Sequence, residues 1–179
     1  MPRPILETAR LILRPYAADD IPDLVSLIGA REIAATTLRI PHPYTKDDAR
    51  DFLASLAHSD QSNFAIVVRK DNHLCGGIGL RPDAPHHHAE LGYWIGVPYW
   101  GHGYATEAGR SLVQYGFERL NLQRIFAMHF QENPASGRVL QKIGMRHEGC
   151  QRGHIYKWGQ IVDLEMYGLL RSEWKAGGS

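Results

Sequence analysis

Residues 90–106, ELGYWIGVPYWGHGYAT, contain a strand, a glycine turn and the start of a helix. In the first half of the stretch, large apolar side chains alternate with small or polar ones, at Leu91, Tyr93, Ile95 and Val97. This period of two is typical of a strand, and Pro98 is expected to end the pairing because it has no backbone N–H. Gly101 and Gly103 follow, and from Ala105 the pattern becomes helical. The stretch therefore predicts a strand that turns directly into a helix N-terminus.

A glycine turn at a helix N-terminus is a favourable seat for a phosphate group. The first N–H groups of a helix have no partner within it, and the helix dipole adds partial positive charge there. Glycine lets the backbone approach an anion because no Cβ lies in the way. The loop is not a P-loop, since GK[ST] is missing, and Thr106 stands where a dinucleotide fingerprint has its third glycine. Judged on the glycines alone, a plain strand-to-helix turn is the alternative interpretation.

Several motifs resemble the GNAT superfamily of N-acetyltransferases, and in particular its RimJ/RimL-like branch. WGHGYATEA resembles the family's pyrophosphate loop, Q/R-x-x-G-x-G/A, with Gly103 and Ala105 at the last two positions. Trp100 departs from the pattern, because Gln or Arg is usual there. The other motifs are TARLILRPY, PHPYT, ELGYWIG, and ENPAS with KIGM. They occur in the family's order and span nearly the whole chain, which makes the resemblance specific.

The expected elements favour a mixed α/β sheet that is mostly antiparallel, with one parallel pair near the centre and helices on its faces. Strands are expected at residues 8–15, 63–70, 73–81, 90–97, 124–130, 145–155 and 160–169. Helices are expected after Asp20, Thr45, Gly103 and Asn133, and loops at residues 31–44 and 82–87. The GNAT resemblance implies the same layout. In that family the parallel strands splay apart, and the pantetheine arm of coenzyme A enters the V between them.

Length and composition indicate one soluble domain. The chain has 179 residues, 44% of them hydrophobic and 22% charged, so we expect a single domain at residues 1–175 and a disordered tail at 176–179. A formal charge of +1 gives no reason to expect nucleic acid or an anionic membrane as a partner. We expect no membrane span and no signal peptide. Cys75 and Cys150 are isolated, and reduced thiols in the cytoplasm are the simplest interpretation.

Transfer of an acetyl group from a thioester to an amine makes three demands on a site. The amine is mostly ammonium at neutral pH and must lose a proton before it attacks. The developing oxyanion needs an N–H donor, which a backbone amide of the splayed strand could supply. The departing thiolate, whose thiol has a pKa of roughly 8.5 by analogy with cysteine, benefits from a proton donor. A base, an oxyanion donor and an acid are therefore expected in the cleft.

Glu90 is the candidate base, acting directly or through water. It starts the central strand, where its carboxylate could face the cleft. In the family that the chain resembles, a glutamate on this strand often has the same role. The alternative is an exposed strand-end glutamate in an ordinary ion pair.

Ser136 is the candidate acid, or a hydrogen-bond donor to the cofactor sulfur. Asn133 and Ser136 match the family's N-x-x-S pattern, and in relatives such residues lie beside the thioester. Asn133 is expected both to cap its helix and to touch the pantetheine arm. Ser136 could instead have only a first-turn role. Many GNAT enzymes use a tyrosine as the acid, so Tyr104 and Tyr156 stay as alternatives.

The resemblance also implies the residues that hold acetyl-CoA. The backbone of Ile95, Gly96 and Val97 would pair with the pantetheine amides. The pyrophosphate would lie on the loop formed by Gly101, His102, Gly103, Tyr104, Ala105 and Thr106. No metal is expected, because the adjacent histidines at residues 86–88 alternate faces in a strand and lack a further ligand at suitable spacing.

The leading hypothesis is an acetyl-CoA-dependent N-acetyltransferase. By resemblance, its acceptor would be a protein N-terminal α-amino group or a small-molecule amine. The alternative from another class is a catalytically silent acyl-CoA-binding or sensor module. A nucleotide-binding oxidoreductase is disfavoured by the mismatches in the glycine loop. The sequence leaves the acceptor open, as well as the choice between a monomer and a homodimer.

Overall fold

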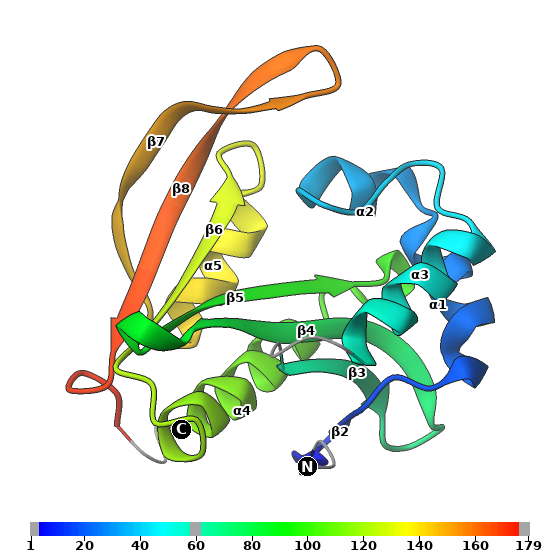
Figure 1. Cartoon of the computed structure of the whole chain (residues 1–179), viewed down its shortest axis with the longest axis horizontal. Helices are drawn as coiled ribbons and strands as arrows, with labels where there is room; N and C mark the ends of the chain where they lie inside the picture. The colour runs from blue at the N-terminus through cyan, green and yellow to red at the C-terminus, as the bar shows by residue number, and fades with distance from the viewer. Residues whose placement is uncertain (1–3, 58–61, 176–179) are drawn as a thin grey trace.

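The computed structural model describes residues 4–57 and 62–175 (Figure 1). The described strands form one sheet in the order β1-β2-β3-β4-β5-β6-β8-β7. The strands are β1 (Leu6–Glu7), β2 (Leu11–Arg14), β3 (Ser62–Val68), β4 (His73–Asp83), β5 (His88–Ile95), β6 (Arg124–Phe130), β7 (Arg146–Lys157) and β8 (Gln160–Leu170). The α-helices are α1 (Ile21–Ile28), α2 (Arg31–Thr36), α3 (Lys46–Ala57), α4 (Tyr104–Glu118) and α5 (Pro134–Lys142). The expected tail at 176–179 lies outside the described residues.

The sheet is antiparallel except between β5 and β6, as predicted. These two strands pair at only three positions, His88 with Arg124, Ala89 with Ile125 and Glu90 with Phe126. On its other side β5 pairs with β4 along its whole length, from His88 to Ile95. β5 and β6 therefore part after Glu90, which confirms the expected splay at the centre of the sheet.

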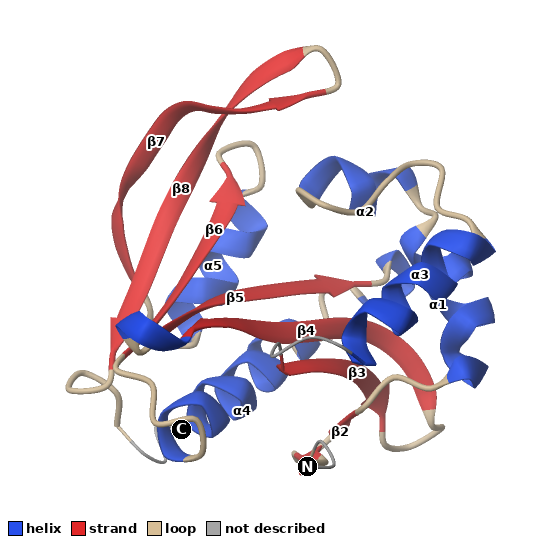
Figure 2. Cartoon of the chain, viewed as in Figure 1, coloured by secondary structure: helices blue, strands red, loops and turns tan. Residues whose placement is uncertain are grey.

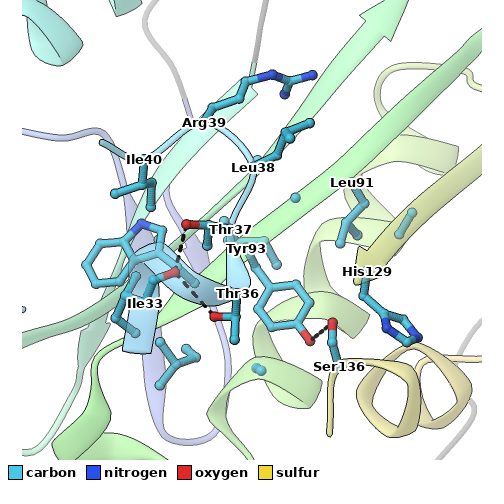
Figure 3. Close-up of a pocket in the computed structure, with 18 of the residues that line it drawn as sticks. Ile33, Thr36, Thr37, Leu38, Arg39, Ile40, Leu91, Tyr93, His129 and Ser136 are labelled. Atoms are coloured by element: carbon cyan, nitrogen blue, oxygen red, sulfur yellow. Dashed lines mark hydrogen bonds between the residues drawn. The ribbon is translucent and has the colours of Figure 1, made fainter. Parts of the chain in front are cut away.

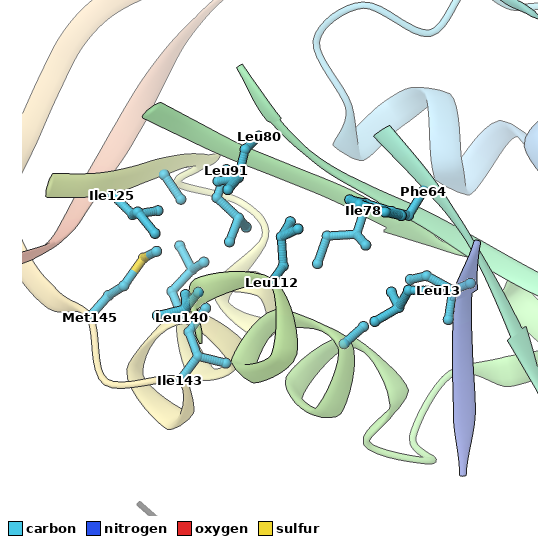
Figure 4. Packing of buried hydrophobic residues seen from close by; sticks show 14 of the residues in the cluster. Leu13, Phe64, Ile78, Leu80, Leu91, Leu112, Ile125, Leu140, Ile143 and Met145 are labelled. Carbon is cyan, nitrogen blue, oxygen red and sulfur yellow. The ribbon is translucent and has the colours of Figure 1, made fainter. Parts of the chain in front are cut away.

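Alternation along the strands gives the sheet two apolar faces. In β3, Phe64 and Ile66 belong to the core beneath α4 and α5, whereas Ala65 and Val67 pack with residues of α1 and α3. Figure 2 shows α1, α2 and α3 gathered on one side of the sheet and α4 on the other. Figure 4 shows the larger core, where Leu112 of α4 meets side chains from the strands. Both faces are covered, so the splayed edge of β5 opens into an interior cleft.

Two predicted helix starts have the expected capping contacts. Before α3, the Thr45 N–H donates to Asp48 Oδ2 at 2.7 Å, and the Asp48 N–H donates to Thr45 Oγ1 at 3.2 Å. This reciprocal pair is a capping box. Before α5, Asn133 Oδ1 accepts a hydrogen bond from the Ser136 N–H at 3.4 Å, with Pro134 at the first helical position. A side-chain cap of this kind contributes typically about 1 kcal/mol.

The structure corrects several expected boundaries, among them those at α2, β2 and β4. Residues 31–36 form α2 rather than a loop, because Ile33 and Ala34 are buried there. The first long strand begins at Leu11, not at residue 8, since Thr8 makes a turn with Leu11. β4 continues through Pro82 to Asp83. β3 pairs with β4 only as far as Leu80, so among the described residues Pro82 has a strand partner on one side, Ala89 of β5.

The central strand ends at Ile95, two residues before the expected end. The Gly96 N–H still donates to Cys75 O at 2.9 Å, after which residues 97–99 form a 3₁₀ turn that contains Pro98. The glycine turn then leads into α4 at Tyr104. Within the described ranges, no helix is both long and apolar enough to cross a lipid bilayer.

Candidate active site

A cleft of about 920 Å³ opens where β5 and β6 part. Its wall contains most of the residues that the sequence singled out, namely Glu90, Ile95, Gly101, Gly103, Tyr104, Ala105, Thr106, Asn133 and Ser136. Gly96, Val97 and His102 do not line it. The volume is within the range of small-molecule sites, which is about 300–1,000 Å³.

The glycine loop leaves the start of α4 open. Gly101 and Gly103 have φ angles of +79° and +78°, a backbone region that favours glycine. Apart from Gly101 and its two neighbours in the chain, no atom of the described residues lies within 4 Å of the position that a Gly101 Cβ would occupy. Gly103 is the N-cap of α4, and no side chain caps that end. The first N–H groups of α4 can therefore donate hydrogen bonds to an anion in the cleft.

An ion pair that the sequence did not reveal fastens this loop to the N-terminal segment. Glu107, in the first turn of α4, accepts hydrogen bonds from Thr8 Oγ1 at 2.7 Å and from Arg10 Nε at 2.7 Å. Burial works against the Glu107 carboxylate, but the bonds from Thr8 and Arg10 outweigh it and lower its pKa. Arg10 Nη1 also donates to His102 O at 2.9 Å. The ion pair thus fixes the glycine loop and the first turn of α4 to the segment that precedes β2.

Trp100, the residue that departs from the GNAT loop pattern, has a defined role. Its indole Nε1 donates to the Ile95 carbonyl oxygen at 2.6 Å. This bond closes the turn between the end of β5 and the glycine loop. The Ile95 carbonyl, which was expected to pair with pantetheine, is therefore engaged by Trp100 in this structure.

Ser136 and Tyr93 form a pair of hydroxyl groups in the cleft wall (Figure 3). Their oxygens are 2.8 Å apart, and either can be the donor. Ser136 comes from the first turn of α5, and Tyr93 comes from β5 beyond the point of splay. Burial raises the pKa of Tyr93 to about 12, although its bond to Ser136 acts in the opposite direction. Tyr93 was not among the predicted tyrosines. Tyr104 lines the cleft, whereas Tyr156 is 76% exposed and does not.

Glu90 is the last residue of β5 that pairs with β6, and two arginines contact its carboxylate. Its Oε2 is 2.8 Å from Arg81 Nη1 and 3.5 Å from Arg39 Nη2. The Glu90 side chain is 23% exposed, so water can reach it. These contacts hold the carboxylate in place at the cleft wall. The same contacts also fit the plain ion pair that was the alternative interpretation.

Histidines of residues 86–88 lie away from this cleft. The rings of His86 and His88 stack at 5.8 Å, and neither lines the cleft. In the part of the chain that the structure describes, no three His, Cys, Asp or Glu side chains group as metal ligands would. A different histidine, His129 of β6, does line the cleft, and the sequence interpretation overlooked it.

The tip of the β7–β8 hairpin reaches across to the segment after α2. Lys157 Nζ donates to the Thr37 carbonyl oxygen. The neighbouring Trp158 ring lies 6.2 Å from the His42 ring and 5.7 Å from the Arg31 guanidinium carbon. Thr37 itself lines the cleft. This bridge therefore stands at one side of the cleft entrance.

Comparison with known proteins agrees with this geometry. Residues 10–146 match the family model described as an acetyltransferase (GNAT) domain. YdaF of Bacillus subtilis, named as a candidate ribosomal N-acetyltransferase, is 40% identical over 168 residues, which cover 92% of this chain and 91% of YdaF.

Solved structures share the fold. The crystal structure of a GNAT-family acetyltransferase from Bacillus anthracis superposes with a TM-score of 0.87 at 28% identity, covering 95% of this chain and 100% of that one. Spermidine N-acetyltransferase from Vibrio cholerae, in complex with CoA and spermine, gives a TM-score of 0.82 at 22% identity. The matched parts cover 93% of this chain and 98% of the Vibrio chain. At that identity, the likeness concerns the fold alone.

Proposed function

This chain belongs to the GNAT acetyltransferase family, and from that premise we propose that it transfers an acetyl group from acetyl-CoA to a primary amine. The observation that carries the proposal is the cleft at the splay of β5 and β6, where an open helix N-terminus and a hydroxyl pair line one cavity. The net reaction makes an amide and a free thiol, and releases one proton from the ammonium form of the acceptor.

The donor side of the cleft fits coenzyme A. A pyrophosphate needs N–H donors and positive charge, and the start of α4, which no described side chain caps, offers its first N–H groups and the positive end of the helix dipole. Gly101 leaves open space for the backbone to approach an anion. We assign the pyrophosphate to residues 101–106, and the pantetheine arm to the end of β5 at Ile95 together with Asn133, both of which line the cleft.

Two residues carry the proposed chemistry. Glu90 takes the first proton from the ammonium group, directly or through water, because its carboxylate lines the cleft and is partly exposed at the paired end of the splay. Ser136 gives a hydrogen bond or a proton to the departing sulfur, and Tyr93 orients its hydroxyl group. These roles follow the GNAT resemblance.

The charges of the cleft favour an acceptor with a single amino group, such as a protein N-terminus. The described charged residues of its wall are Arg39, Arg81, Arg138, Lys142, Asp48, Asp51 and Glu90. Basic groups outnumber acidic ones, and Glu90 already has two arginine partners. With four basic groups against three acidic ones, the wall offers no net attraction to a polyamine, which carries several positive charges. A small neutral or acidic amine fits these charges equally well.

Turnover of acetyl-CoA tests the proposal against a silent acyl-CoA-binding module. We expect free thiol to be released when acetyl-CoA is mixed with short peptides that have free N-termini, and less release with spermidine. N-terminally blocked peptides of the same sequence serve as the control. If the protein binds acetyl-CoA in calorimetry but releases no thiol with any amine of the panel, it is a binding module rather than an enzyme.

A further inference from the structure

Gly92 leaves an open space in the wall of the cleft. It lies in the part of β5 that no longer pairs with β6, and it lines the cleft. Apart from Gly92 and its two neighbours in the chain, no atom of the described residues lies within 4 Å of the position that a Gly92 Cβ would occupy. Its φ is outside the left-handed region, so the backbone conformation does not require glycine. The fold thus gives no reason for the missing side chain.

The residue opposite Gly92 on β4 is also a glycine, but the space there is filled. Gly79 pairs with Gly92 across the two strands. A Cβ at Gly79 would lie 2.3 Å from Asn63 Oδ1, so the Asn63 side chain covers this glycine. The opening is therefore confined to Gly92.

The open space lies on the same face of the sheet as the candidate base. Side chains alternate along a strand, so Glu90, Gly92 and Trp94 share one face. Trp94 packs with buried residues of α1 and α3, whereas Tyr93 packs against the core beneath α4 and α5. The space over Gly92 therefore has the Glu90 carboxylate toward one end and the Trp94 indole toward the other.

Apolar side chains make up much of the cleft wall on this face. Those from α2, the segment after it and α3 are Ile33, Leu38, Ile40, Phe52 and Leu56. In Figure 3, Ile33 and Ile40 lie on one side of Tyr93, and Ser136 lies on the other. The apolar part of the wall is therefore separate from the part that carries Ser136.

Polar side chains among these residues already have partners within the protein. The hydroxyl groups of Thr36 and Thr37 donate to the Ile33 carbonyl oxygen at 3.3 and 2.7 Å. The Trp94 indole N–H donates to the Tyr16 hydroxyl group. These side chains therefore add mainly apolar surface to the wall.

On the basis of the proposed acetyl transfer, we propose that the space over Gly92 is a subsite for an apolar group on the carbon next to the acceptor amine. Two residues of a strand span about 7 Å, so an amine at Glu90 would carry that group over Gly92. The group would displace water from the surfaces of Trp94 and Leu38, and this burial favours the acceptor that carries it. The acceptor class is a peptide, or a smaller primary amine, with a side chain of about the size of leucine beside its amino group.

A peptide backbone lying close over the strand is the alternative occupant of this space. Glycine within a strand often marks such an approach. The two arrangements make different demands on the acceptor. A side-chain subsite makes the rate depend on the first side chain of a peptide, whereas a backbone contact treats all first residues alike.

The kinetic test compares two peptides that differ only in their first residue, Leu or Gly. We expect the wild-type protein to prefer the Leu peptide by at least about tenfold in kcat/KM. Gly92→Val fills the space and should lower kcat/KM for the Leu peptide at least about tenfold more than for the Gly peptide. A wild-type protein without preference for the Leu peptide would overturn the inference and leave acetyl transfer intact. An equal loss for both peptides in Gly92→Val would do the same.

Leu38→Ala tests the opposite wall of the subsite, and serves alone if Gly92→Val fails to fold. We expect it to reduce the preference for the Leu peptide about threefold or more. Leu170→Ala is the matched control, because Leu170 is 40% exposed, close to the 44% of Leu38, but lies outside the cleft. This control should keep the wild-type preference. An unchanged preference in Leu38→Ala would contradict the subsite.

Calorimetry with N-acetylated peptides tests the subsite without turnover, because these peptides are the products of the proposed reaction. We expect the acetyl-Leu peptide to bind the wild-type protein at least about tenfold more tightly than the acetyl-Gly peptide. This difference should shrink in Gly92→Val. Equal affinities for the wild-type protein would overturn the subsite. Failure to release thiol with any amine would instead overturn the proposed function, and calorimetry would still decide the subsite.

Discussion

The hydroxyl groups of Ser136 and Tyr93 are joined across 43 positions of the sequence. We expect Ser136→Ala to lower kcat about 100-fold and to change the KM for acetyl-CoA much less, because the donor acts when the thiolate leaves. Tyr93→Phe removes only the supporting bond, worth about 1 kcal/mol or roughly a fivefold change in kcat. Steady-state kinetics of both variants measures this ranking. An unchanged kcat in Ser136→Ala would mean that the hydroxyl group has only a structural role in the first turn of α5.

Glu90→Gln tests the proposed base while keeping an oxygen for Arg81. We expect kcat/KM for the acceptor to fall about 100-fold and its rise with pH to disappear or shift. The pH profile of kcat/KM should be measured with two acceptors of different pKa. The rise caused by the enzyme's base should occur at the same pH for both acceptors, while the rise caused by ionisation of the amine should shift with the amine's pKa.

The matched control for Glu90 is Glu148→Gln. Glu148 also pairs with an arginine, Arg124, but lies outside the cleft. This variant should keep the wild-type profile. If Glu90→Gln also keeps it with both acceptors, Glu90 serves only to pair with Arg81 and Arg39.

For single residues, the sequence predicted which side chains line the cleft better than it predicted which side chains they contact. Glu90, Asn133 and Ser136 do meet in one cleft, because motif spacing places them at a strand start and a helix start. Tyr93 and His129 were missed, since each looks like an ordinary core residue of an apolar strand. Only the approach of α5 brings Ser136 to Tyr93 and Gly137 to His129, and nothing local in the sequence encodes that approach.

At the scale of elements, the turn from β5 into α4 gives the sharpest test. Gly103→Val should weaken acetyl-CoA binding by at least ~1.4 kcal/mol, or tenfold, because a branched side chain strains the positive φ and obstructs the approach of the phosphate. Calorimetry measures the affinity directly.

Gly159→Val is the matched control for the loop. Gly159 has a similar φ of +82° and open space around it, but lies in the β7–β8 turn. Any general cost of backbone strain should therefore appear in both variants, and the loss of affinity only in Gly103→Val. Equal affinities in the two folded variants would remove the loop from the binding site.

Helices and strands with strong local sequence signals were predicted well. Those that form only because they pack against other elements were not. The strand at 124–130 matches β6 as predicted, and the Thr45–Asp48 pair marks the start of α3 as a capping box. α2 has only six residues, too few for a clear helical period, and it is held by burial of Ile33 and Ala34. The sequence also did not predict how many residues of β5 and β6 pair, because packing across the sheet sets that number.

At the scale of the whole molecule, Arg14 and Asp20 tie β2 to the start of α1. Asp20 is 5% exposed and accepts hydrogen bonds from Arg14 Nη1 at 2.8 Å and Nη2 at 2.6 Å. Burial disfavours the carboxylate, but the bonds from Arg14 and from the Ala17 N–H outweigh it and lower the pKa of Asp20. We expect Asp20→Asn to lower the free energy of unfolding by about 3 kcal/mol at pH 7.

The sign of the pH dependence follows from the lowered pKa. The contribution of Asp20 is complete above its unfolded pKa of about 3.9 and is lost as pH falls through the lower folded value. Denaturant unfolding should therefore show the gap between wild type and Asp20→Asn narrowing as the pH is lowered below about 4. Asp19→Asn, at an exposed neighbour, should change stability by less than about 0.5 kcal/mol. A gap that is constant with pH would contradict this assignment.

The contact between the β7–β8 hairpin and Thr37 has a topological consequence. With Lys157 on the Thr37 carbonyl and Trp158 beside Arg31, the hairpin, the sheet and the segment after α2 form a closed ring, and Thr37 of that ring lines the cleft. The free end of a flexible polypeptide can thread through a ring, whereas an internal segment of a folded chain cannot. We therefore expect a flexible N-terminus to thread through it, while the same amine on a rigid, folded surface stays outside. Opening the ring with Lys157→Ala should widen the range of acceptors.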